Sequence, residues 1–335
     1  TFVSGKMNFM KKVLGIGNAL VDIMTILDSD KFLTQLEIQK GSMQLVDSDL
    51  SSEILKLSEQ FKREISSGGS AANTIHGLAN LGTPTTFIGK TGDDVYGKFF
   101  SDDMRNNGID PLLLTGLSDT GRAIALISPD SERTFATYLG ASVELSHEDL
   151  STEMFLQFDY LYIEGYLVQN HKLVEKILEF ANQHPCKICL DLASYNVVGQ
   201  NLDFLKKVMS DYVDIVFANE EEAKAFTGLE PEKALDVLAG ICGIAVVKVG
   251  HKGSLVKQGN NLYRIEPRES KCIDTTGAGD AYAAGFIYGL ANDLPLEKCG
   301  EIGSLLAGKV IEVIGAKMDQ SIWAEIKELL PLSRK

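Results

Sequence analysis

The sequence predicts an α/β protein with a doubly wound, mostly parallel sheet and a second, small β-sheet. From Leu145 onward, short apolar runs of strand length alternate with helical patterns. That alternation is typical of a parallel sheet covered by helices on both faces. Residues 110–142 break the alternation with a polar–apolar pattern typical of a β-hairpin. The chain is therefore expected to fold as a large α/β domain with a small β lid.

The second half of the chain supplies most of the expected parallel sheet. Strands are predicted at 160–165, 187–192, 215–219 and 244–249, and helices at 171–184, 202–210, 220–226, 231–239, 299–314 and 321–330. Glu164, Asp191, Asn219 and Gly250 fall at the ends of these strands. Ligands of such sheets bind beyond the carboxyl ends of the strands, so these four residues are expected to share one edge.

The first half adds strands at 13–17, 21–26 and 85–89 and helices at 48–62 and 71–81. Gly15 and Gly17 nearly match a dinucleotide-binding fingerprint, but Leu20 stands at the third glycine and a strand follows. Residues 92–99 nearly match a P-loop, but Phe99 replaces the hydroxyl residue that binds Mg²⁺. Both kinds of site are excluded on these grounds.

The small sheet is expected from two separate segments, 31–47 and 110–142. The second contains a hairpin with strands at 122–128 and 133–139. The large domain then comprises 13–30, 48–109 and 143–335. Residues 1–12 lack the apolar stretch of a signal peptide and are interpreted as a leader or a cloning remnant.

Charge and cysteine content limit the partners of this 335-residue chain. Its formal net charge is −14, which disfavours nucleic acid and anionic membrane surfaces as partners. No run of 18 apolar residues exists, so no membrane span is expected. The odd, sparse set of five cysteines indicates a reducing compartment, and Cys186 and Cys189 are interpreted as free thiols. These features together predict a cytoplasmic location.

The most informative motif is Asp274-Thr-Thr-Gly-Ala-Gly-Asp280, between a strand-like run at 263–273 and a predominantly small, apolar helix. Its two glycines allow a sharp turn and close approach of a ligand. The helix start offers free N–H groups and partial positive charge to an anion such as phosphate. Asp280 is a carboxylate in that anion site, which makes chemical sense for a base that deprotonates an attacking hydroxyl. The alternative is that Thr276 or Asp280 merely caps the helix.

Four motifs in order resemble the ribokinase-like (PfkB) carbohydrate and nucleoside kinases. They are the 274–280 motif, the Gly-rich segment 68–73 with its following glycines to Gly97, the Asn-x-x-Glu motif at 219–222, and the strand and turn at 248–253. The resemblance covers residues 15–314 and is closest in pattern to the family's adenosine kinases. It implies an ATP-dependent phosphotransferase that uses Mg²⁺.

The resemblance implies catalytic roles for five residues. Asp280 would be the general base on the acceptor hydroxyl. The backbone N–H groups of Gly277, Ala278 and Gly279, with that of Asp280, would form the anion hole for the transferring phosphoryl group. Arg133, on the lid hairpin, would reach the phosphates when the lid closes.

Further roles concern the two substrates and the ions. The acceptor site would comprise Asn18, Asp22, Gly68, Gly69, Asn73 and Glu164. The ATP site would comprise Asn219, Glu222, Lys248, Gly250 and Gly253, with the first two also organising Mg²⁺, through water. Asp274, Thr276 and Gly315 match positions that in some members line a monovalent-cation site, so K⁺ is a further expected ion.

The spacing from Gly17 to Asp22 resembles the nucleoside-kinase form of the acceptor site. The expected reaction is phosphorylation of the 5′-hydroxyl of adenosine. The alternatives are a free sugar, namely ribose, fructose or a keto-deoxy acid, and an inactive relative that only binds nucleotide. An apolar slot for a base could be formed by Leu20, Met43, Phe135, Tyr138 and Tyr166, or these side chains could be ordinary packing. The resemblance also implies a homodimer through the lid edges, with a monomer as the alternative.

Overall fold

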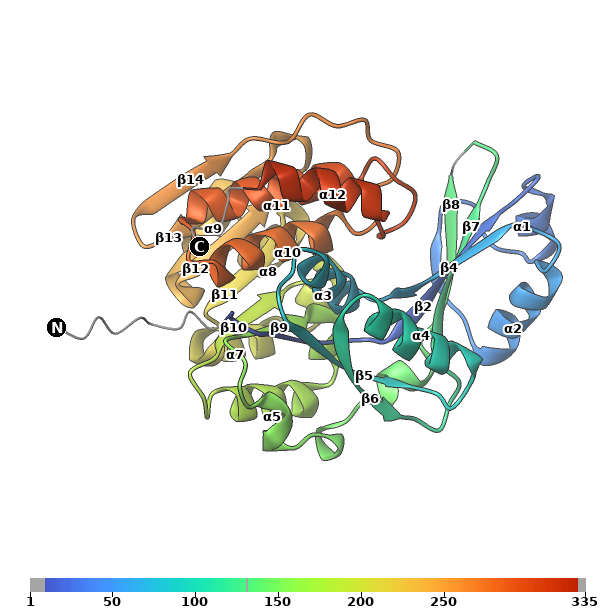
Figure 1. Cartoon of the computed structure of the whole chain (residues 1–335), viewed down its shortest axis with the longest axis horizontal. Coiled ribbons are helices and arrows are strands. Elements are labelled where there is room, and N and C mark those ends of the chain that lie inside the picture. The colour runs from blue at the N-terminus through green and yellow to red at the C-terminus, as the bar shows by residue number, and fades with distance from the viewer. Residues whose placement is uncertain (1–9, 131, 331–335) are drawn as a thin grey trace.

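A nine-stranded sheet forms the centre of the larger part of the molecule, in a computed structural model that describes residues 10–130 and 132–330 (Figure 1). Its strands, in spatial order, are β14 (Asn261–Ile265), β13 (Ser254–Gln258), β12 (Ile244–Lys248), β11 (Ile215–Asn219), β10 (Lys187–Asp191), β9 (Tyr160–Glu164), β1 (Val13–Ile16), β5 (Thr85–Thr91) and β6 (Ile109–Thr115). The strands from β12 to β6 are parallel, and β13 and β14 add an antiparallel edge. The predicted doubly wound, mostly parallel sheet is confirmed.

Alternate residues of the large sheet enter two hydrophobic cores, one on each face. On β9, Tyr160 and Tyr162 belong to one core and Leu161 and Ile163 to the other. The first core is covered by α3 (Ser70–Asn80), α4 (Val95–Asn106), α10 (Ala278–Ala291), α11 (Leu296–Val310) and α12 (Gln320–Leu329). The second is covered by α5 (His171–Ala181), α6 (Tyr195–Gln200), α7 (Leu202–Tyr212), α8 (Glu220–Thr227) and α9 (Pro231–Cys242). Burial on both faces explains the nearly continuous apolar character of the central strands.

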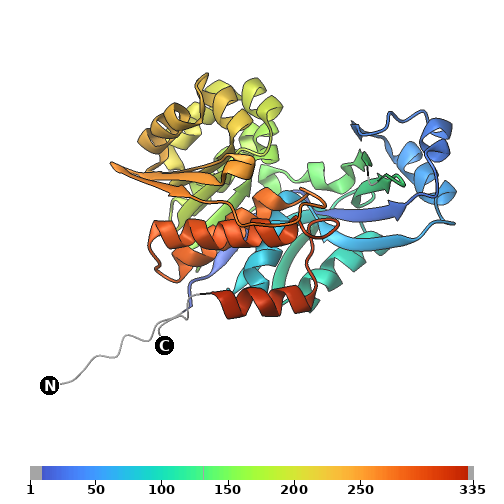
Figure 2. The same ribbon diagram turned by 90° about the horizontal axis from the view of Figure 1, so that it is seen from above.

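The small sheet projects from one side of the large one and is seen from above in Figure 2. Its strand order is β3 (Met43–Leu45), β8 (Arg133–Tyr138), β7 (Gly121–Ile127), β2 (Leu20–Ile26) and β4 (Arg63–Gly68). Ile23 and Ile124 on one face pack under α1 (Lys31–Gln35) and α2 (Ser48–Leu57). The other face points toward the large domain, because strand residues alternate between faces. We call this sheet with α1 and α2 the lid.

The predicted lid boundaries differ from the observed sheet at three strands. β2 and β4, which the sequence analysis placed in the large domain, belong to the lid sheet, and β6 belongs to the large sheet instead of the lid. Only residues 17–19 separate β1 from β2, so the chain crosses between the sheets without a change in composition. The predicted hairpin of β7 and β8 is confirmed.

Two local predictions need correction. The strand-like run before the 274–280 motif ends at Ile265, and residues 266–277 form an irregular connection. The segment 31–47 contains helix α1 as well as the expected strand. Short 3-10 helices, which the apolar pattern does not predict, lie at Gly140–Glu144, His147–Asp149, Thr152–Phe155, Gly165–Gln169 and Gly250–Lys252.

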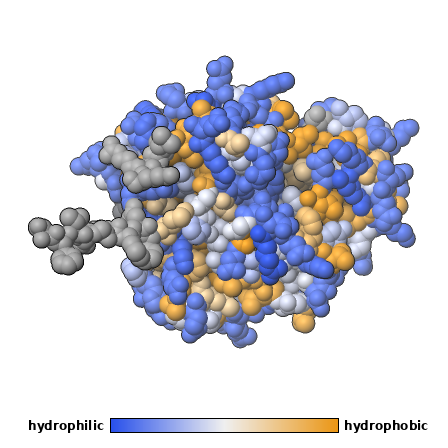
Figure 3. Space-filling model, in the orientation of Figure 1, coloured by the Kyte–Doolittle hydropathy of each residue, from blue (hydrophilic) through white to orange (hydrophobic). Residues whose placement is uncertain are grey.

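The cysteines are unpaired thiols, as expected for Cys186 and Cys189. In the described part of the chain, no helix combines the length and apolar character needed to cross a membrane. Figure 3 shows a mostly hydrophilic face on which hydrophobic residues form separate patches. The predicted leader, 1–12, lies outside the described residues except for 10–12, which have no regular structure.

Candidate active site

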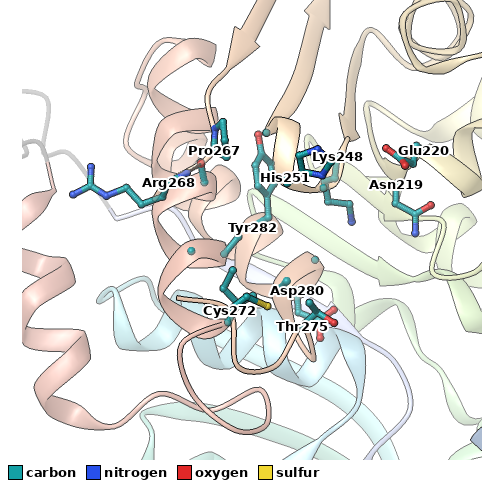
Figure 4. Close-up of a pocket in the computed structure, with 18 of the residues that line it drawn as sticks. Asn219, Glu220, Lys248, His251, Pro267, Arg268, Cys272, Thr275, Asp280 and Tyr282 are labelled. Carbon is teal, nitrogen blue, oxygen red and sulfur yellow. Dashed lines mark hydrogen bonds between the residues drawn. The ribbon is translucent and has the colours of Figure 1, made fainter. Parts of the chain in front are cut away.

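Two cavities meet at Asp280. The larger, of about 1070 Å³, lies beyond the carboxyl ends of β10, β11 and β12 (Figure 4). The smaller, of about 170 Å³, lies between the lid and the starts of α3 and α10. Ser70 and Asp280 line both. A carboxylate at this junction can contact the contents of both cavities, so we call the larger the donor cavity and the smaller the acceptor cavity.

Asp280 is held by hydrogen bonds from α3. Ser70 Oγ donates to its Oδ1 at 2.7 Å, and Asn73 Nδ2 donates to its Oδ2 at 3.0 Å. Helix α10 begins after Gly277, which has a φ of 76°, and its start has no side-chain cap. The interpretation of Thr276 or Asp280 as a simple helix cap is therefore wrong. The carboxylate is oriented by a neighbouring helix and faces the two cavities.

Burial raises the pKa of Asp280 to about 6, while hydrogen bonds from Ser70 and Asn73 partly oppose that shift. The negative charge of Asp191 raises the pKa further, and Lys248 lowers it. A pKa just below neutrality suits a general base, because the group is ionised at pH 7 yet still basic enough to accept a proton. The geometry and the pKa thus agree on proton abstraction.

The start of α10 offers backbone N–H groups to the donor cavity. Ala278, Gly279 and Asp280 line that cavity, and the first N–H groups of a helix have no intrahelical acceptor. One of them, that of Ala278, donates to the carbonyl of Thr275 at 3.2 Å. A Cβ on Gly279 would lie 3.1 Å from Lys248 Nζ, so an amino group stands beside this turn. The arrangement can bind a phosphoryl group.

Lys248 is a buried cation that stays charged. Its Nζ lies 3.1 Å from Asp191 Oδ2. Burial alone would lower its pKa, but the negative charges of Asp191 and Glu222 outweigh that effect and raise it. Figure 4 shows Lys248 and Asn219 on the strand side of the donor cavity and Asp280 and Thr275 on the helix side. Asp191, which the sequence analysis placed at this edge without a role, is therefore the partner of Lys248.

Asn219 and Glu222 form a capping box at the start of α8. Asn219 donates to Glu222 through its backbone N–H at 2.8 Å and its side-chain amide at 2.7 Å, and accepts the Glu222 N–H at 2.8 Å. Each Glu222 oxygen accepts one of these bonds and keeps a lone pair. Burial and the nearby Asp191 raise the pKa of Glu222, so a cation next to it would be favourable.

These donor-side residues fit Mg²⁺ held through water. Among the described residues no group of three His, Cys, Asp or Glu could hold a metal by itself. Mg²⁺ in kinases usually keeps several waters and is bound by one or two carboxylates plus substrate phosphates. Glu222, with Asn219 fixing its orientation, fits that pattern.

Other parts of the donor cavity were not predicted from sequence. Gly250 and Gly253 line it as expected, and a Cβ on Gly253 would lie 2.0 Å from the carbonyl oxygen of Ile265. The irregular connection after β14 and one face of α11 also line it, through Pro267, Arg268, Glu269, Ser270, Cys272, Ser304, Ala307, Gly308 and Ile311. No motif marks these residues, because they contribute by their position and not by a characteristic spacing.

The acceptor cavity contains only part of the predicted acceptor set. Asp22, Gly69 and Asn73 line it, and Gly68 lies against the Asp22 carboxyl, where a Cβ would lie 2.2 Å away. Asn18 and Glu164 line neither cavity. Asn18 Nδ2 donates to Glu164 Oε1 at 2.5 Å, and the N–H of Ala71 donates to Oε2 at 3.0 Å. This pair supports the start of α3.

The wall of the acceptor cavity that carries Asp22 comes from the lid. Met24, Ala123, Ala125 and Phe135 line it, alongside Arg133. Of the five residues expected to form an apolar slot, only Phe135 is in this cavity. Met43 is 70% exposed and Tyr166 lines the donor cavity. Leu20 contacts Gly121, and Tyr138 stacks with Arg122.

Lys317 was missed by the sequence analysis. Its amino group is buried without a hydrogen-bond partner among the described residues. It follows Gly315 and Ala316, which line the acceptor cavity. Burial lowers its pKa, whereas Asp103, Asp22 and Asp280 raise it. A single lysine outside any motif gave no sequence signal, because only the fold brings it near these carboxylates.

Comparison with known proteins identifies the family. Residues 42–322 match the pfkB family of carbohydrate kinases. The crystal structure of adenosine kinase from Sinorhizobium meliloti is 35% identical, covers 96% of this chain and 100% of that chain, and has a TM-score of 0.84. A probable sugar kinase protein from Rhizobium etli is 34% identical over 96% and 98%, also with a TM-score of 0.84.

Among curated proteins, 5-dehydro-2-deoxygluconokinase from Geobacillus thermodenitrificans is 31% identical over 73% of this chain and 78% of its own length. Proteins named for different acceptors are thus similar to this chain over most of its length. The family's kinases use ATP and transfer phosphate to alcohol groups, and the arrangement around Asp280 suits that reaction. By its matched residues, its ribokinase-like fold and its site, this chain belongs to the pfkB family of carbohydrate kinases.

Proposed function

We propose that this protein phosphorylates the 5′-hydroxyl of adenosine with ATP and Mg²⁺. The observation that carries the proposal is the position of Asp280 between the donor and acceptor cavities. Asp280 takes the proton of the acceptor hydroxyl as that oxygen attacks the terminal phosphorus. The N–H groups at the start of α10 and the amino group of Lys248 stabilise the charge of the transferring group.

The donor-side residues position ATP. Glu222 and Asn219 would hold Mg²⁺ through water, and the metal would offset the charge of the phosphates. Both Gly250 and Gly253 line the donor cavity, and the absence of a side chain at Gly253 lets the turn after β12 pack directly against the backbone of Ile265. Most of the catalysis in this arrangement comes from positioning and charge stabilisation, as expected for phosphoryl transfer.

The charges around the acceptor cavity favour a neutral, hydroxyl-rich acceptor. Asp22 and Asp280 line the cavity, and the guanidinium of Arg133 is paired with Asp274. The amino group of Lys317 faces Asp22, Asp280 and Asp103. Carboxylates therefore outnumber cations, so an acceptor carboxylate would meet net repulsion. A ribose can donate its hydroxyl protons to Asp22, and Met24 and Phe135 offer apolar contact to a base.

The second candidate function is phosphorylation of a free sugar. Two observations favour it: the relatives named 5-dehydro-2-deoxygluconokinase, and the acceptor cavity of about 170 Å³, which is closer to the size of a sugar than of a nucleoside. A nucleoside would require the lid to move outward, or the base to extend beyond this cavity.

A coupled assay for ADP separates the candidates. Purified protein with Mg-ATP is given adenosine, other nucleosides, ribose, fructose or 5-dehydro-2-deoxygluconate. Adenosine is expected to give the highest kcat/KM, with the product identified as the 5′-monophosphate. A higher kcat/KM for a free sugar would overturn the nucleoside proposal. ATP binding without turnover of any acceptor would indicate an inactive relative.

We also propose a cellular location and an oligomeric state. The free thiols are consistent with a reducing, cytoplasmic compartment. The lid edge strand β3 exposes Met43 and Leu45, at 70% and 73%, which supports pairing of two lids in a homodimer. Sedimentation at micromolar concentration distinguishes a dimer from a monomer, and localisation of the tagged protein in cells tests the compartment.

A further inference from the structure

One ion pair joins the lid to the loop that carries the 274–280 motif. Arg133, the first residue of β8, pairs through Nη1 with Asp274 and donates to Thr276 Oγ1 at 3.1 Å. The two side chains are 14% and 4% exposed. Because three residues separate Asp274 from the start of α10, this pair lies next to the anion hole.

Asp274 collects donors from three separate parts of the chain. Besides Arg133 from the lid, the N–H of Thr276 donates to its Oδ1 at 2.9 Å. The N–H of Gly315, in the connection between α11 and α12, donates to its Oδ2 at 2.6 Å. Oδ1 therefore has two donors, Thr276 N–H and Arg133, and Oδ2 has one, and the only full positive charge among these partners is the guanidinium.

These contacts do not fit the monovalent-cation site that the family resemblance implies. A bound K⁺ needs oxygen lone pairs directed at it, with carboxylate charge in excess. Here Thr276 and Gly315 present N–H groups to Asp274, and the Thr276 hydroxyl oxygen accepts from Arg133. A cation added beside the guanidinium would be repelled by it. The charge that K⁺ would supply is already present in the chain.

We infer that the guanidinium of Arg133 takes the place of a monovalent cation, so that this kinase works without K⁺. Because Arg133 belongs to the lid, its guanidinium neutralises the Asp274 carboxylate only when the lid is in this position. When the lid moves outward, the guanidinium moves away with it. Arg133 is then a positioning residue: it acts on the phosphoryl site through Asp274 and the turn that follows. The inference needs only the family's kinase reaction and does not depend on which acceptor is used.

The test compares wild type with Arg133→Gln, Arg133→Lys and the control Lys62→Gln. Lys62 is an exposed lid residue whose one ion pair among the described residues is with Glu64, so its replacement removes the same charge from the same domain. Kinase activity and melting temperature are measured in K⁺ and in tetramethylammonium at equal ionic strength. Binding of Tl⁺, a K⁺ substitute, is measured directly by ²⁰⁵Tl NMR without substrates.

Wild type and Lys62→Gln are expected to show equal activity and melting temperature in the two salts and no Tl⁺ binding. Arg133→Gln should melt at a lower temperature and lose roughly 10-fold or more in kcat, because the turn before the anion hole is no longer fixed. K⁺ should restore part of both losses, and Tl⁺ should bind. Arg133→Lys should keep most of the activity in either salt.

Two results would overturn the inference. The first is a wild-type protein that is activated by K⁺ or that binds Tl⁺. The second is an Arg133→Gln protein whose losses K⁺ does not reduce. If that variant fails to fold, wild type and Asp274→Asn decide instead. If K⁺ activates the wild type and Asp274→Asn abolishes that activation, a K⁺ site lies at Asp274 and the inference is wrong. If K⁺ has no effect on the wild type, the result supports Arg133 as the cation.

Discussion

The two cavities on either side of Asp280 are built in different ways. In the part of the chain that the structure describes, the donor cavity is lined only by the large domain, mainly at the carboxyl ends of its parallel strands and the starts of its helices. The acceptor cavity takes half of its lining residues from lid strands, where Asp22, Met24, Ala123, Ala125 and Phe135 project from one face. The donor cavity therefore depends on one rigid domain, and the acceptor cavity depends on how two sheets meet.

This difference separates the reaction from its substrate preference. The donor cavity, which we propose binds ATP, is lined by backbone groups and by the buried Lys248–Asp191 pair. The acceptor site is shaped by lid side chains that can change without disturbing the large sheet. We therefore expect substitutions to divide into those that change ATP kinetics and those that change acceptor kinetics, with Asp280 as the residue common to both.

The largest effect is expected for Asp280→Asn, which removes the base between the cavities. Its kcat should fall at least ~10²-fold, with modest changes in both KM values, because binding groups on either side remain. Burial raises the pKa of Asp280 above its unfolded value, so the ionised carboxylate lowers stability at pH 7. The variant should therefore melt no lower than wild type. Near-normal turnover in the steady-state assay would remove Asp280 as the base.

Lys248→Met tests the donor side alone. It removes the amino group beside the α10 turn and leaves Asp191 buried without its partner. The kcat should fall and KM for ATP should rise, together lowering kcat/KM for ATP roughly 10- to 100-fold, because the amino group that stabilises the phosphoryl group is lost, while KM for the acceptor changes little. Lys257→Met, which breaks a pair with the exposed Asp236, is the matched control. An equal rise in both KM values would show that the cavities are not independent.

Phe135→Ala tests the acceptor side alone. Removing this aromatic contact should raise KM for the acceptor about 10-fold, from the loss of apolar contact area, and leave KM for ATP unchanged. Met43→Ala, on the same lid but 70% exposed, should leave both values unchanged. If Phe135→Ala instead raises KM for ATP and leaves KM for the acceptor unchanged, the acceptor does not contact this wall of the lid.

The smallest expected effect is a shift in pH dependence. Activity requires ionised Asp280, whose pKa is about 6, so kcat/KM should fall tenfold per pH unit below that value. The positive charge of Lys317 lowers the pKa of Asp22 and attracts Asp280. Lys317→Met should therefore move the acidic limb to higher pH, and Lys317→Arg should not. If the acidic limb of the kcat/KM profile does not shift in Lys317→Met, Lys317 does not influence the ionisation of Asp280.

Sequence patterns predicted the donor side better than the acceptor side, for a physical reason. Parallel strands place their ends at one edge, so the positions of Asn219, Lys248 and Asp280 follow from the order of strands and helices. The lid sheet pairs β2 with β7, and Leu20 lies opposite Gly121. No local pattern contains that pairing. The boundary of the lid and most of the proposed apolar slot were therefore misplaced.

Lys317 and the Asn18–Glu164 pair illustrate the same limit at single residues. Asn18 and Glu164 are polar groups at strand ends, which suggested ligand contacts, but they satisfy each other and the start of α3. Lys317 has no motif around it and becomes informative only because the fold buries its amino group near three carboxylates. Distances in sequence do not distinguish a polar residue that faces a ligand from one that faces another polar residue.

The glycine starts of α3 and α10 have a consequence for how such enzymes diverge. Gly69 and Gly277 have φ values of 99° and 76°, and a Cβ on either would collide, with the Asn18 carbonyl oxygen at 2.1 Å or with Ala316 at 2.6 Å. The start of α10 presents main-chain N–H groups to the donor cavity, and every amino acid other than proline supplies such a group identically. Mutation can therefore diversify the acceptor, through lid side chains, far more easily than it can alter the chemistry. This accounts for the similar identity, 35% and 31%, of this chain to an adenosine kinase and to a 5-dehydro-2-deoxygluconokinase.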